Sequence, residues 1–503
     1  MPNYQNEGSS YKLLSALLTS ERISPYQYEI ANCVSDINIY EDINRPFLTG
    51  KIAFSDFNDV INKISFSGDE KIKLTLRKSD TNAEDIVRTF NLDYIIESKE
   101  VNNNSAEVYV FHMVEDVEYE SNIKNVNKYY EGKPSEIIQN IINDYIPNRV
   151  FVNVSPNHES DNILKVIIPN LNPLEAINWV CKKANSDDGL PFFCFTTLLG
   201  GGTNNNYFIY YINLKWLLLQ GVLNKEPYTY TQSSLTKNSN EYGNPGERQI
   251  INQRYQILDY KDTSSDDLRT LISEGMIGST HRFVDIINGE ENKVRQNIGY
   301  SLVRLQQLGL LSDDYLGYTY NIASRQDNIL LAEKESAKIY NYPSLKPYEI
   351  GFSNQTSMVE ERDGGSYGLK VNSTAILYLL YKRKMTITLE GANFIGTNVN
   401  RTVGNLINIA FIKPDHSDNS KSDYDKRKSG RQIITKAVHM FKQNDYHIGL
   451  DICKLESIKK SPSSPAQDVI DALQFFEGIT TVWYLQLIQN IMVIILNRFM
   501  VKS

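Results

Sequence analysis

Cysteine and tryptophan are scarce in this chain, which has four cysteines and three tryptophans among its 503 residues. The cysteines are scattered and form no CxxC pair, so neither a zinc site nor a disulfide framework is expected. Their spacing predicts buried free thiols in a protein that folds in a reducing cytoplasm. The four positions are Cys33, Cys181, Cys194 and Cys453.

The common catalytic and cofactor-binding motifs are missing as well. There is no phosphate-binding P-loop, no HExxH, no GxSxG, and no GxGxxG between a strand and a helix. The glycine run 200–202 lies between two expected strands, which favours a hairpin turn over a nucleotide site. The sequence therefore predicts no catalytic residue, no cofactor-binding residue and no cofactor, and we expect a protein that is not an enzyme.

Metal ligands are not grouped in the sequence. The six histidines are isolated, and only His439 and His447 could face each other across an expected hairpin. A metal site needs three or four ligands, and no third or fourth can be named. The acidic segment that contains Asp415, Asp418, Asp423 and Asp425 lacks the glycine and the final glutamate of a calcium loop. No metal site is predicted.

Two pairs of adjacent acidic residues are the remaining candidates for catalysis. Glu115 with Asp116, or Asp187 with Asp188, could in principle serve glycoside hydrolysis. No stretch rich in aromatic residues surrounds either pair, and adjacent acids are common on protein surfaces. We interpret both pairs as ordinary surface acids.

The charge balance and the N-terminus exclude two further classes. With 52 basic and 60 acidic residues the net charge is −8, which argues against general nucleic-acid binding. The N-terminus has no charged segment followed by an apolar core, so no secretory signal peptide is expected. The 32 tyrosines fit a chain rich in half-buried strands.

What the sequence does contain is alternation with a period of two near both ends. Residues 26–114 alternate, apart from a helix or loop expected around 56–64, and 385–413 and 431–457 are typical of strand, glycine turn, strand and a long hairpin. In the segment 107–113, alternate side chains should face opposite sides of a sheet. Helices are expected at 134–145 and at 172–184, where Asn172 can cap the first turn. Alternation is expected to return near 373.

These patterns predict an α+β chain of about three or four domains. The expected parts are a first antiparallel β-barrel at 1–114, an inserted α+β domain at 115–225, a second antiparallel β-barrel made of 226–265 with 366–457, an inserted mixed or helical segment at 266–365, and a linker with an apolar helical tail at 458–503.

The tail from 478 to 500 is strongly apolar and long enough to cross a bilayer. Glutamines and asparagines interrupt it, and these are costly in hydrocarbon. We expect a buried helix that contacts other subunits or a partner, with membrane contact and an irregular terminus as alternatives. The candidate contact residues recur at helical spacing: Leu485, Ile488, Met492, Ile495 and Phe499.

The order of these pieces resembles the central baseplate hub protein of T-even-type contractile-tailed phages. The matching segments are 43–76 (INRPFLTGKIAFSDFNDVINKISFSGDEKIKLTL), 108–145, 172–195 (NPLEAINWVCKKANSDDGLPFFCF), 268–290 and 430–457. The resemblance implies two tail-tube-like barrels in each subunit and a homotrimer that presents six similar modules around a ring. It implies as partners a threefold central spike, the sixfold tail tube and other baseplate proteins, in a virion assembled in a bacterial cytoplasm. The resemblance does not extend to the apolar tail after 457, so it implies no role for the tail.

Two other classes remain as alternatives: a tail-associated cell-wall hydrolase and a carbohydrate-binding adhesin. A hydrolase should show convergent acids or a nucleophile beside a base. An adhesin should carry aromatic residues on its loops, whereas these loops are rich in Asn, Asp, Ser and Gly.

Overall fold

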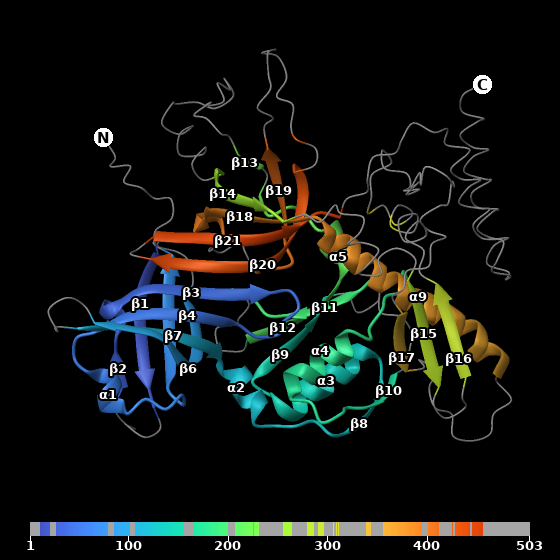
Figure 1. Cartoon of the computed structure of the whole chain (residues 1–503), viewed down its shortest axis with the longest axis horizontal. Helices are drawn as coiled ribbons and strands as arrows, with labels where there is room; N and C mark the ends of the chain where they lie inside the picture. The colour runs from blue at the N-terminus through green and yellow to red at the C-terminus, as the bar shows by residue number, and fades with distance from the viewer. Residues whose placement is uncertain are drawn as a thin grey trace, which may run out of the picture. The chain divides into compact units, whose positions relative to one another are not determined.

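The computed structural model describes residues 11–20, 27–78, 85–100, 106–154, 164–199, 207–224, 226–230, 255–263, 279–285, 290–295, 305, 308, 310, 339–343, 356–394, 401–411, 425, 428–442 and 445–455. These residues form mostly β-sheet with few helices, so the predicted α+β class is confirmed (Figure 1).

The first β unit comprises seven strands and one short helix, and its strands pair in the order β3-β4-β7-β6-β5-β1-β2. Its elements are β1 (Tyr11–Thr19), β2 (Gln27–Glu29), β3 (Val34–Asp42), β4 (Thr49–Asp56), α1 (Val60–Ile64), β5 (Lys71–Lys78), β6 (Ile86–Glu100) and β7 (Glu107–Glu115), with a 3-10 turn at Ala31–Cys33.

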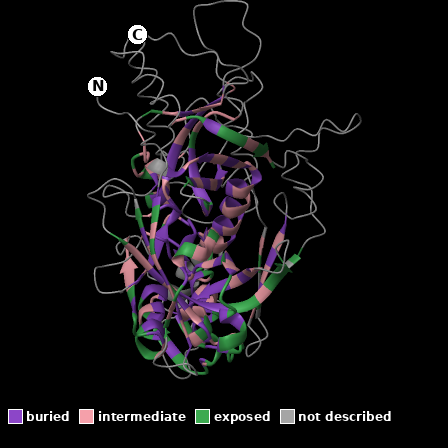
Figure 2. Cartoon of the chain, turned by 90° about the vertical axis from the view of Figure 1, so that its left-hand side faces the viewer, coloured by how far each residue is buried: buried purple, intermediate pink, exposed green. Residues whose placement is uncertain are grey.

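Alternation explains why these segments are strands around one core. In β7, Tyr109, Phe111 and Met113 are buried, while the residues between them are half-buried on the other face, as predicted. The Phe111 ring stacks on that of Phe54 with 5.6 Å between centroids. Figure 2 shows buried residues recurring along these strands. Gly50 is required in β4, because a Cβ there would lie 2.6 Å from the backbone oxygen of Asn38.

The middle domain follows the first β unit, and its described residues form four helices and five strands. Its elements are α2 (Asp116–Asn122), β8 (Tyr129–Gly132), α3 (Pro134–Tyr145), β9 (Arg149–Asn153), β10 (Leu164–Ile167), α4 (Pro173–Cys181), β11 (Phe192–Phe195), β12 (Tyr207–Asn213) and α5 (Leu214–Leu219).

Both predicted helices of the middle domain are confirmed. Asn172 caps α4 by accepting a hydrogen bond from the backbone N–H of Glu175 at 2.8 Å. Helix α3 buries Ile137, Ile138 and Ile141 in the core that it shares with α4. Strand β12 pairs antiparallel with β11 and parallel with β9.

Among the described residues, the two end strands of the second β unit meet only at a single bridge. The strands of this unit are β13 (Tyr228–Tyr230), β14 (Ile257–Asp262), β18 (Lys384–Glu390), β19 (Leu406–Phe411), β20 (Gly430–Lys442) and β21 (Asp445–Cys453), with a 3-10 turn at Gly391–Asn393. They pair in the order β13-β19-β20-β21-β18-β14, and Thr229 of β13 bridges Gln256 beside β14. The β13–β19 pair is parallel, so the prediction of a wholly antiparallel barrel is wrong at this position.

One strand pair fuses the two β units into a single sheet. The second half of β20 pairs antiparallel with β3, from Lys436 opposite Asp42 to Lys442 opposite Asp36 (Figure 1). The first half of β20 pairs with β19 instead. Thirteen strands therefore belong to one hydrogen-bonded sheet.

The remaining described elements are a small sheet and a long helix. The sheet contains β15 (Thr280–Asp285), β16 (Glu290–Arg295) and β17 (Ile339–Pro343), and the helix is α9 (Thr356–Lys382). The prediction of alternation near 373 is wrong, because Val371, Ala375 and Leu379 are buried at a spacing of four, which is a helical period.

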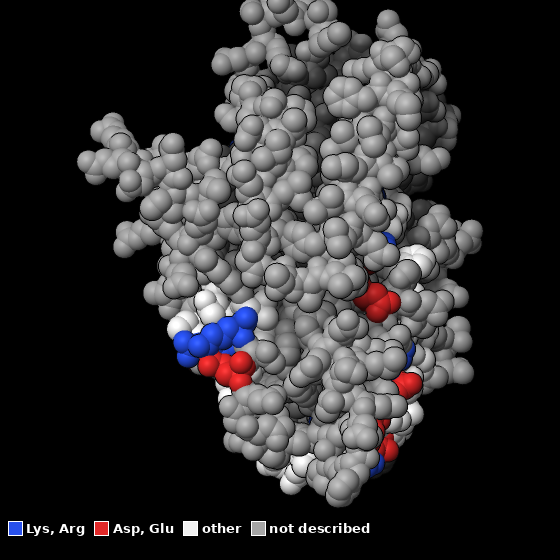
Figure 3. All heavy atoms as spheres, turned by 90° about the vertical axis from the view of Figure 1, so that its right-hand side faces the viewer, with Lys and Arg blue, Asp and Glu red and all other residues white. Residues whose placement is uncertain are grey.

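Charges on the small sheet are mixed. Arg282 and Lys293 each pair with Glu291 at 3.3 Å. On the face shown in Figure 3, described basic and acidic side chains likewise lie next to each other.

The chain divides into two compact units, of which the second consists of 297–333 and 457–503. Nearly all described elements belong to the first. No helix within the described ranges is long and apolar enough to cross a membrane. The predicted tail lies outside those ranges, as do its candidate contact residues.

Candidate functional site

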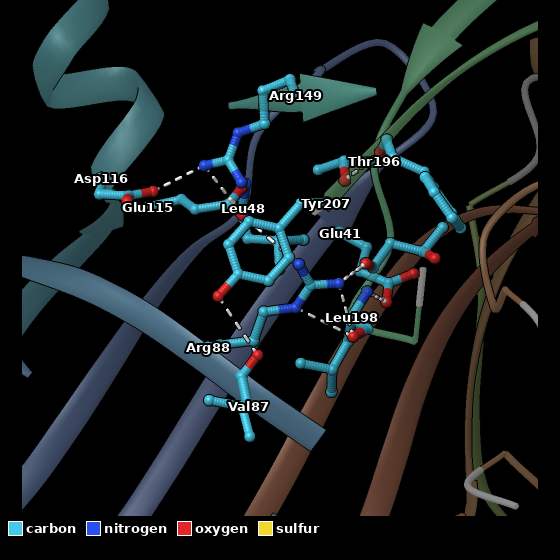
Figure 4. A network of polar contacts seen from close by, with 12 residues as sticks. Glu41, Leu48, Val87, Arg88, Glu115, Asp116, Arg149, Thr196, Leu198 and Tyr207 are labelled. Carbon is cyan, nitrogen blue, oxygen red and sulfur yellow. Dashed lines mark hydrogen bonds and ion pairs between the residues drawn. The ribbon is translucent and has the colours of Figure 1, made fainter. Parts of the chain in front are cut away.

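Charged side chains gather in a buried network where the first β unit, the middle domain and the second β unit meet (Figure 4). Every carboxylate or guanidinium in it except that of Asp116 is less than a tenth exposed. Its members are Glu41, Arg88, Glu115, Asp116, Arg149, Tyr207, His439 and Tyr446.

Arg88 links the first β unit to the middle domain. It lies on β6 at an inward-facing position, and its side chain is 2% exposed. Its Nη2 donates to the backbone oxygens of Thr197 at 2.6 Å and Leu198 at 2.7 Å, and its Nε donates to Leu198 at 3.0 Å. Burial lowers the pKa of the Arg88 guanidinium, and nearby Glu115 opposes that shift.

Two guanidinium groups contact the ring of Tyr207, which stands at the start of β12. The Cζ atom of Arg88 lies 4.1 Å from the ring centroid and that of Arg149 lies 4.5 Å from it. Both contacts fall within the range of cation–π attraction. The Tyr207 hydroxyl donates to the backbone oxygen of Val87 at 3.4 Å, and burial raises the pKa of Tyr207.

Glu115, the last residue of β7, lies between these two arginines. Its Oε1 is 3.7 Å from Arg88 and 3.5 Å from Arg149, while its Oε2 accepts from the backbone N–H of Leu48 at 3.0 Å. Arg149 also donates to Asp116 at 2.6 Å. A buried carboxylate is tolerated in such a place because opposite charges and hydrogen bonds surround it.

Glu41 of β3 connects all three parts of the chain. Its Oε1 accepts from the backbone N–H of Leu198 at 2.6 Å, and its Oε2 accepts from that of Val403 at 3.2 Å. The same Oε1 lies 2.9 Å from Nε2 of His439, whose Nδ1 lies 2.8 Å from the Tyr446 hydroxyl. Burial, with the charge of Glu41 adding to it, raises the pKa of Tyr446 well above its ordinary value.

This arrangement is suited to holding chain segments together. Two cavities stand out among the described residues, and neither is lined by a member of the network. The larger of these two, about 130 Å³, lies beside Tyr28, Phe54 and Lys63 of the first β unit. The network joins parts of the fold and lines neither of these two cavities.

The structure separates the two histidines considered for a metal. His439 is buried opposite Ile448, whereas His447 lies opposite Met440 and points to the other face of the hairpin. The described residues contain no group of three potential metal ligands. Of the acidic segment only Asp425 is described, and the tail candidates are not.

The interpretation of the adjacent acids is wrong for Glu115, which is buried in the network. Asp188 pairs with Lys215 at 2.8 Å. A sequence signal for the network did exist. Glu41 follows Ile37 and Ile39, and Arg88 precedes Phe90, at the same inward positions of alternating strands. A charged residue in an inward position predicts a buried ion pair.

No protein-family model and no curated protein matches the chain. Comparison with solved structures gives several matches at low identity. A tail protein from Neisseria meningitidis is 8% identical, with 88% of this chain and 96% of that chain covered and a TM-score of 0.45. A 43 kDa prophage tail protein from Shewanella oneidensis is 8% identical, with 89% and 100% covered and a TM-score of 0.42.

A component of the type VI secretion system of Escherichia coli, described as similar in structure to tail proteins of bacteriophage T4, is 8% identical. Here 86% of this chain and 76% of that chain are covered, and the TM-score is 0.41.

Proposed function

We propose that the chain is a structural baseplate hub protein of a contractile phage tail. In this proposal three copies form a ring in the virion that adapts the sixfold tail tube to the threefold central spike. The observation that carries the proposal is the fusion of two β units into one sheet through β20 and β3. Three copies with two such units each can present six similar modules around one axis.

The sheet has strand edges that a neighbouring copy can extend. Eight strands run from β14 through β18, β21, β20, β3, β4 and β7 to β6. The second half of β6, Tyr94–Glu100, pairs with β7 alone among the described strands. Within the described residues, strand β14 pairs along its length only with β18. Such edges are templates for pairing with another chain, and head-to-tail pairing closes a ring.

A row of opposite charges on the outer face of the sheet starts at the junction of the two units and continues into the second unit. Lys436 on β20 pairs with Asp42 on β3 at 2.9 Å, and Lys384 on β18 pairs with Asp451 on β21 at 2.9 Å. Lys436 and Asp451 are also opposite each other in the register. Networks of this kind contribute more than isolated surface pairs, which suits a joint that must keep two modules in a fixed relation.

Native mass spectrometry of the full chain tests the proposal, with charge placed on the β6 edge. Tyr94 and Ile96 are 52% and 40% exposed there, so Y94K/I96K should block pairing and shift a trimer towards monomer. The matched control is Y129K/I167K, which alters a similarly exposed pair on β8 and β10. If both variants gave the same mass, the β6 edge would not be part of the interface. A monomeric wild type would contradict the ring.

A further inference from the structure

The first β unit contains a cavity of about 130 Å³ that is lined by β2 and by the segment from β4 to α1. A cavity of about 150 Å³ holds one benzene molecule, so this one has room for a group of about five or six non-hydrogen atoms. Three aromatic rings, two carboxylates and one ammonium group are part of its lining, and we name it the Phe57 cavity. These groups belong to Tyr28, Phe54, Phe57, Glu29, Asp56 and Lys63.

The three rings come from two segments of the chain. Phe54 is 1% exposed, and its ring is held in place by the stacking on Phe111. Phe57 is 62% exposed, and in the part of the chain that the structure describes no other aromatic ring contacts the rings of Phe57 and Tyr28. The face of an aromatic ring attracts a cation that lies within about 6 Å of its centre. Two of the three rings are therefore available to a ligand.

Glu29 places a negative charge beside these rings. Its carboxylate accepts hydrogen bonds from the backbone N–H groups of Ala16 at 2.7 Å and Ala31 at 3.1 Å and from the hydroxyl of Ser15 at 2.5 Å. Burial by itself would raise the pKa of Glu29, but these hydrogen bonds outweigh it and lower the pKa, so the group is ionised at neutral pH. All three donors are uncharged and do not cancel the negative charge.

Asp56 adds a second carboxylate to the lining. It accepts from three backbone N–H groups between 58 and 61, at 2.9 to 3.2 Å. Among the described residues, no basic side chain forms an ion pair with Glu29 or Asp56. Lys63, the cation in this set, donates to the backbone oxygen of Asn58 at 2.5 Å. Two carboxylates against one ammonium group give the six residues an excess of negative charge.

We propose that the Phe57 cavity binds an organic cation of the size of a trimethylammonium group. The faces of the rings attract the positive charge, and the methyl groups gain from leaving water. Rings grouped in this way recognise quaternary ammonium ligands in other proteins. The two carboxylates oppose an anion and give a neutral molecule of the same shape no electrostatic gain. The inference does not rest on the hub proposal.

Titration of the full chain with choline, followed by saturation-transfer difference NMR, tests the inference. The matched ligand is the neutral analogue of choline in which a carbon atom replaces the ammonium nitrogen, because it has the same shape without the charge. Choline should bind about tenfold more tightly than this analogue. Absence of choline binding, or equal affinities of the two compounds, would overturn the inference.

Substitutions of Phe57 test the contribution of the ring. F57L keeps an apolar side chain, so choline binding should weaken about fivefold while binding of the neutral analogue changes by less than about twofold. F57W should bind choline at least as tightly as the wild type, because tryptophan gives the strongest contact of this kind. Phe57 is exposed, so neither variant should disturb folding. The control Y119L alters a side chain that is 41% exposed on α2 and should bind choline as the wild type does. Equal affinities of F57L and Y119L would contradict the proposed site.

The charge of the lining is tested separately. Lys63 opposes a cationic ligand, so K63Q should tighten choline binding about twofold or more, whereas K99Q at an exposed position of β6 should leave it unchanged. Weaker binding in K63Q would argue against a cationic ligand.

A trimethylammonium group is present both in free choline and in the headgroup of phosphatidylcholine. Cosedimentation with phosphatidylcholine vesicles that is lost in F57L would identify the ligand as a lipid headgroup. Binding of choline without cosedimentation would identify it as a soluble cation. Cosedimentation that F57L leaves unchanged, in a protein that does not bind choline, would place the contact elsewhere and overturn the inference.

Discussion

Nε2 of His439 lies 2.9 Å from Oε1 of Glu41, and neither side chain is exposed to solvent. His439 stands on β20 and Glu41 on β3, the two strands that join the β units. Glu41 also accepts hydrogen bonds from Leu198 and Val403. A single carboxylate therefore holds the middle domain and two segments of the second β unit against the first.

Replacing Glu41 with glutamine should destabilise the whole fold. The amide cannot accept from all three donors, so at least one buried donor loses its partner. We expect the free energy of unfolding in urea to fall by about 2–4 kcal/mol. The control E100Q, at an exposed position of β6, should change it by no more than about 0.5 kcal/mol. Equal effects of the two variants would show that the buried carboxylate contributes no more to the free energy of unfolding than an exposed one.

Arg88 and Glu115 should be energetically coupled. Replacing Arg88 with methionine leaves the buried Glu115 with less compensation, and breaking such a pair costs about 3–5 kcal/mol. The double variant R88M/E115Q also removes the uncompensated charge. Its loss in free energy of unfolding should therefore be smaller than the sum of the losses in the two single variants. A double-mutant cycle in urea measures the coupling. Strictly additive losses would mean that the 3.7 Å approach carries no interaction.

The Cys453 thiol should make stability depend on alkaline pH. Burial raises its pKa from 9.0 to about 11. Because the folded-state pKa is raised, the stability that it contributes is complete below pH 9 and is lost as the pH rises towards 11. A shift of this size corresponds to about 2–3 kcal/mol.

Unfolding of the wild type and of C453A at pH 7–11 isolates this contribution from that of the tyrosines. The difference in unfolding free energy between the two proteins should be constant up to about pH 8 and should shrink above it. A difference that stays constant to pH 11 would show that the thiol does not titrate in this way.

The apolar tail should serve assembly and not folding. We propose that Leu485, Ile488, Met492, Ile495 and Phe499 contact neighbouring subunits or a tail partner. Deleting 461–503 should leave a soluble, folded trimer that incorporates poorly into tails, as measured by mass and by reconstitution. Failure of the truncated chain to fold would assign the tail to a core, and stable insertion of the tail into liposomes would assign it to a membrane.

Local patterns predicted the local structure well. The alternation of 107–113, the capped helix after Asn172 and the hairpin at 431–457 follow from side-chain period and turn chemistry, which act over a few residues. The alternation predicted near 373 is wrong because alternating and helical patterns share several apolar positions in this segment. Parallel pairing of β13 with β19 depends on residues some 180 positions apart, Tyr228 and Ile409, which no local pattern encodes.

The sequence predicts which charged side chains of the network face inward, but not which groups they contact. The inward positions of Glu41, Arg88 and His439 were readable from their neighbours in each strand. The contacts that these side chains make could not be predicted, because Arg88 bonds Leu198 and Glu41 bonds Val403 across long separations in the chain. Contacts of that kind are fixed by tertiary packing, so a single sequence indicates the need for a partner without identifying it.

Cryo-electron microscopy of the purified full-length chain tests the central claim most directly. The account predicts a threefold ring in which the two β units of each copy alternate around a central channel, with β6 of one copy beside β14 of the next. A monomer, or a twofold assembly that leaves both strand edges uncovered, would contradict it.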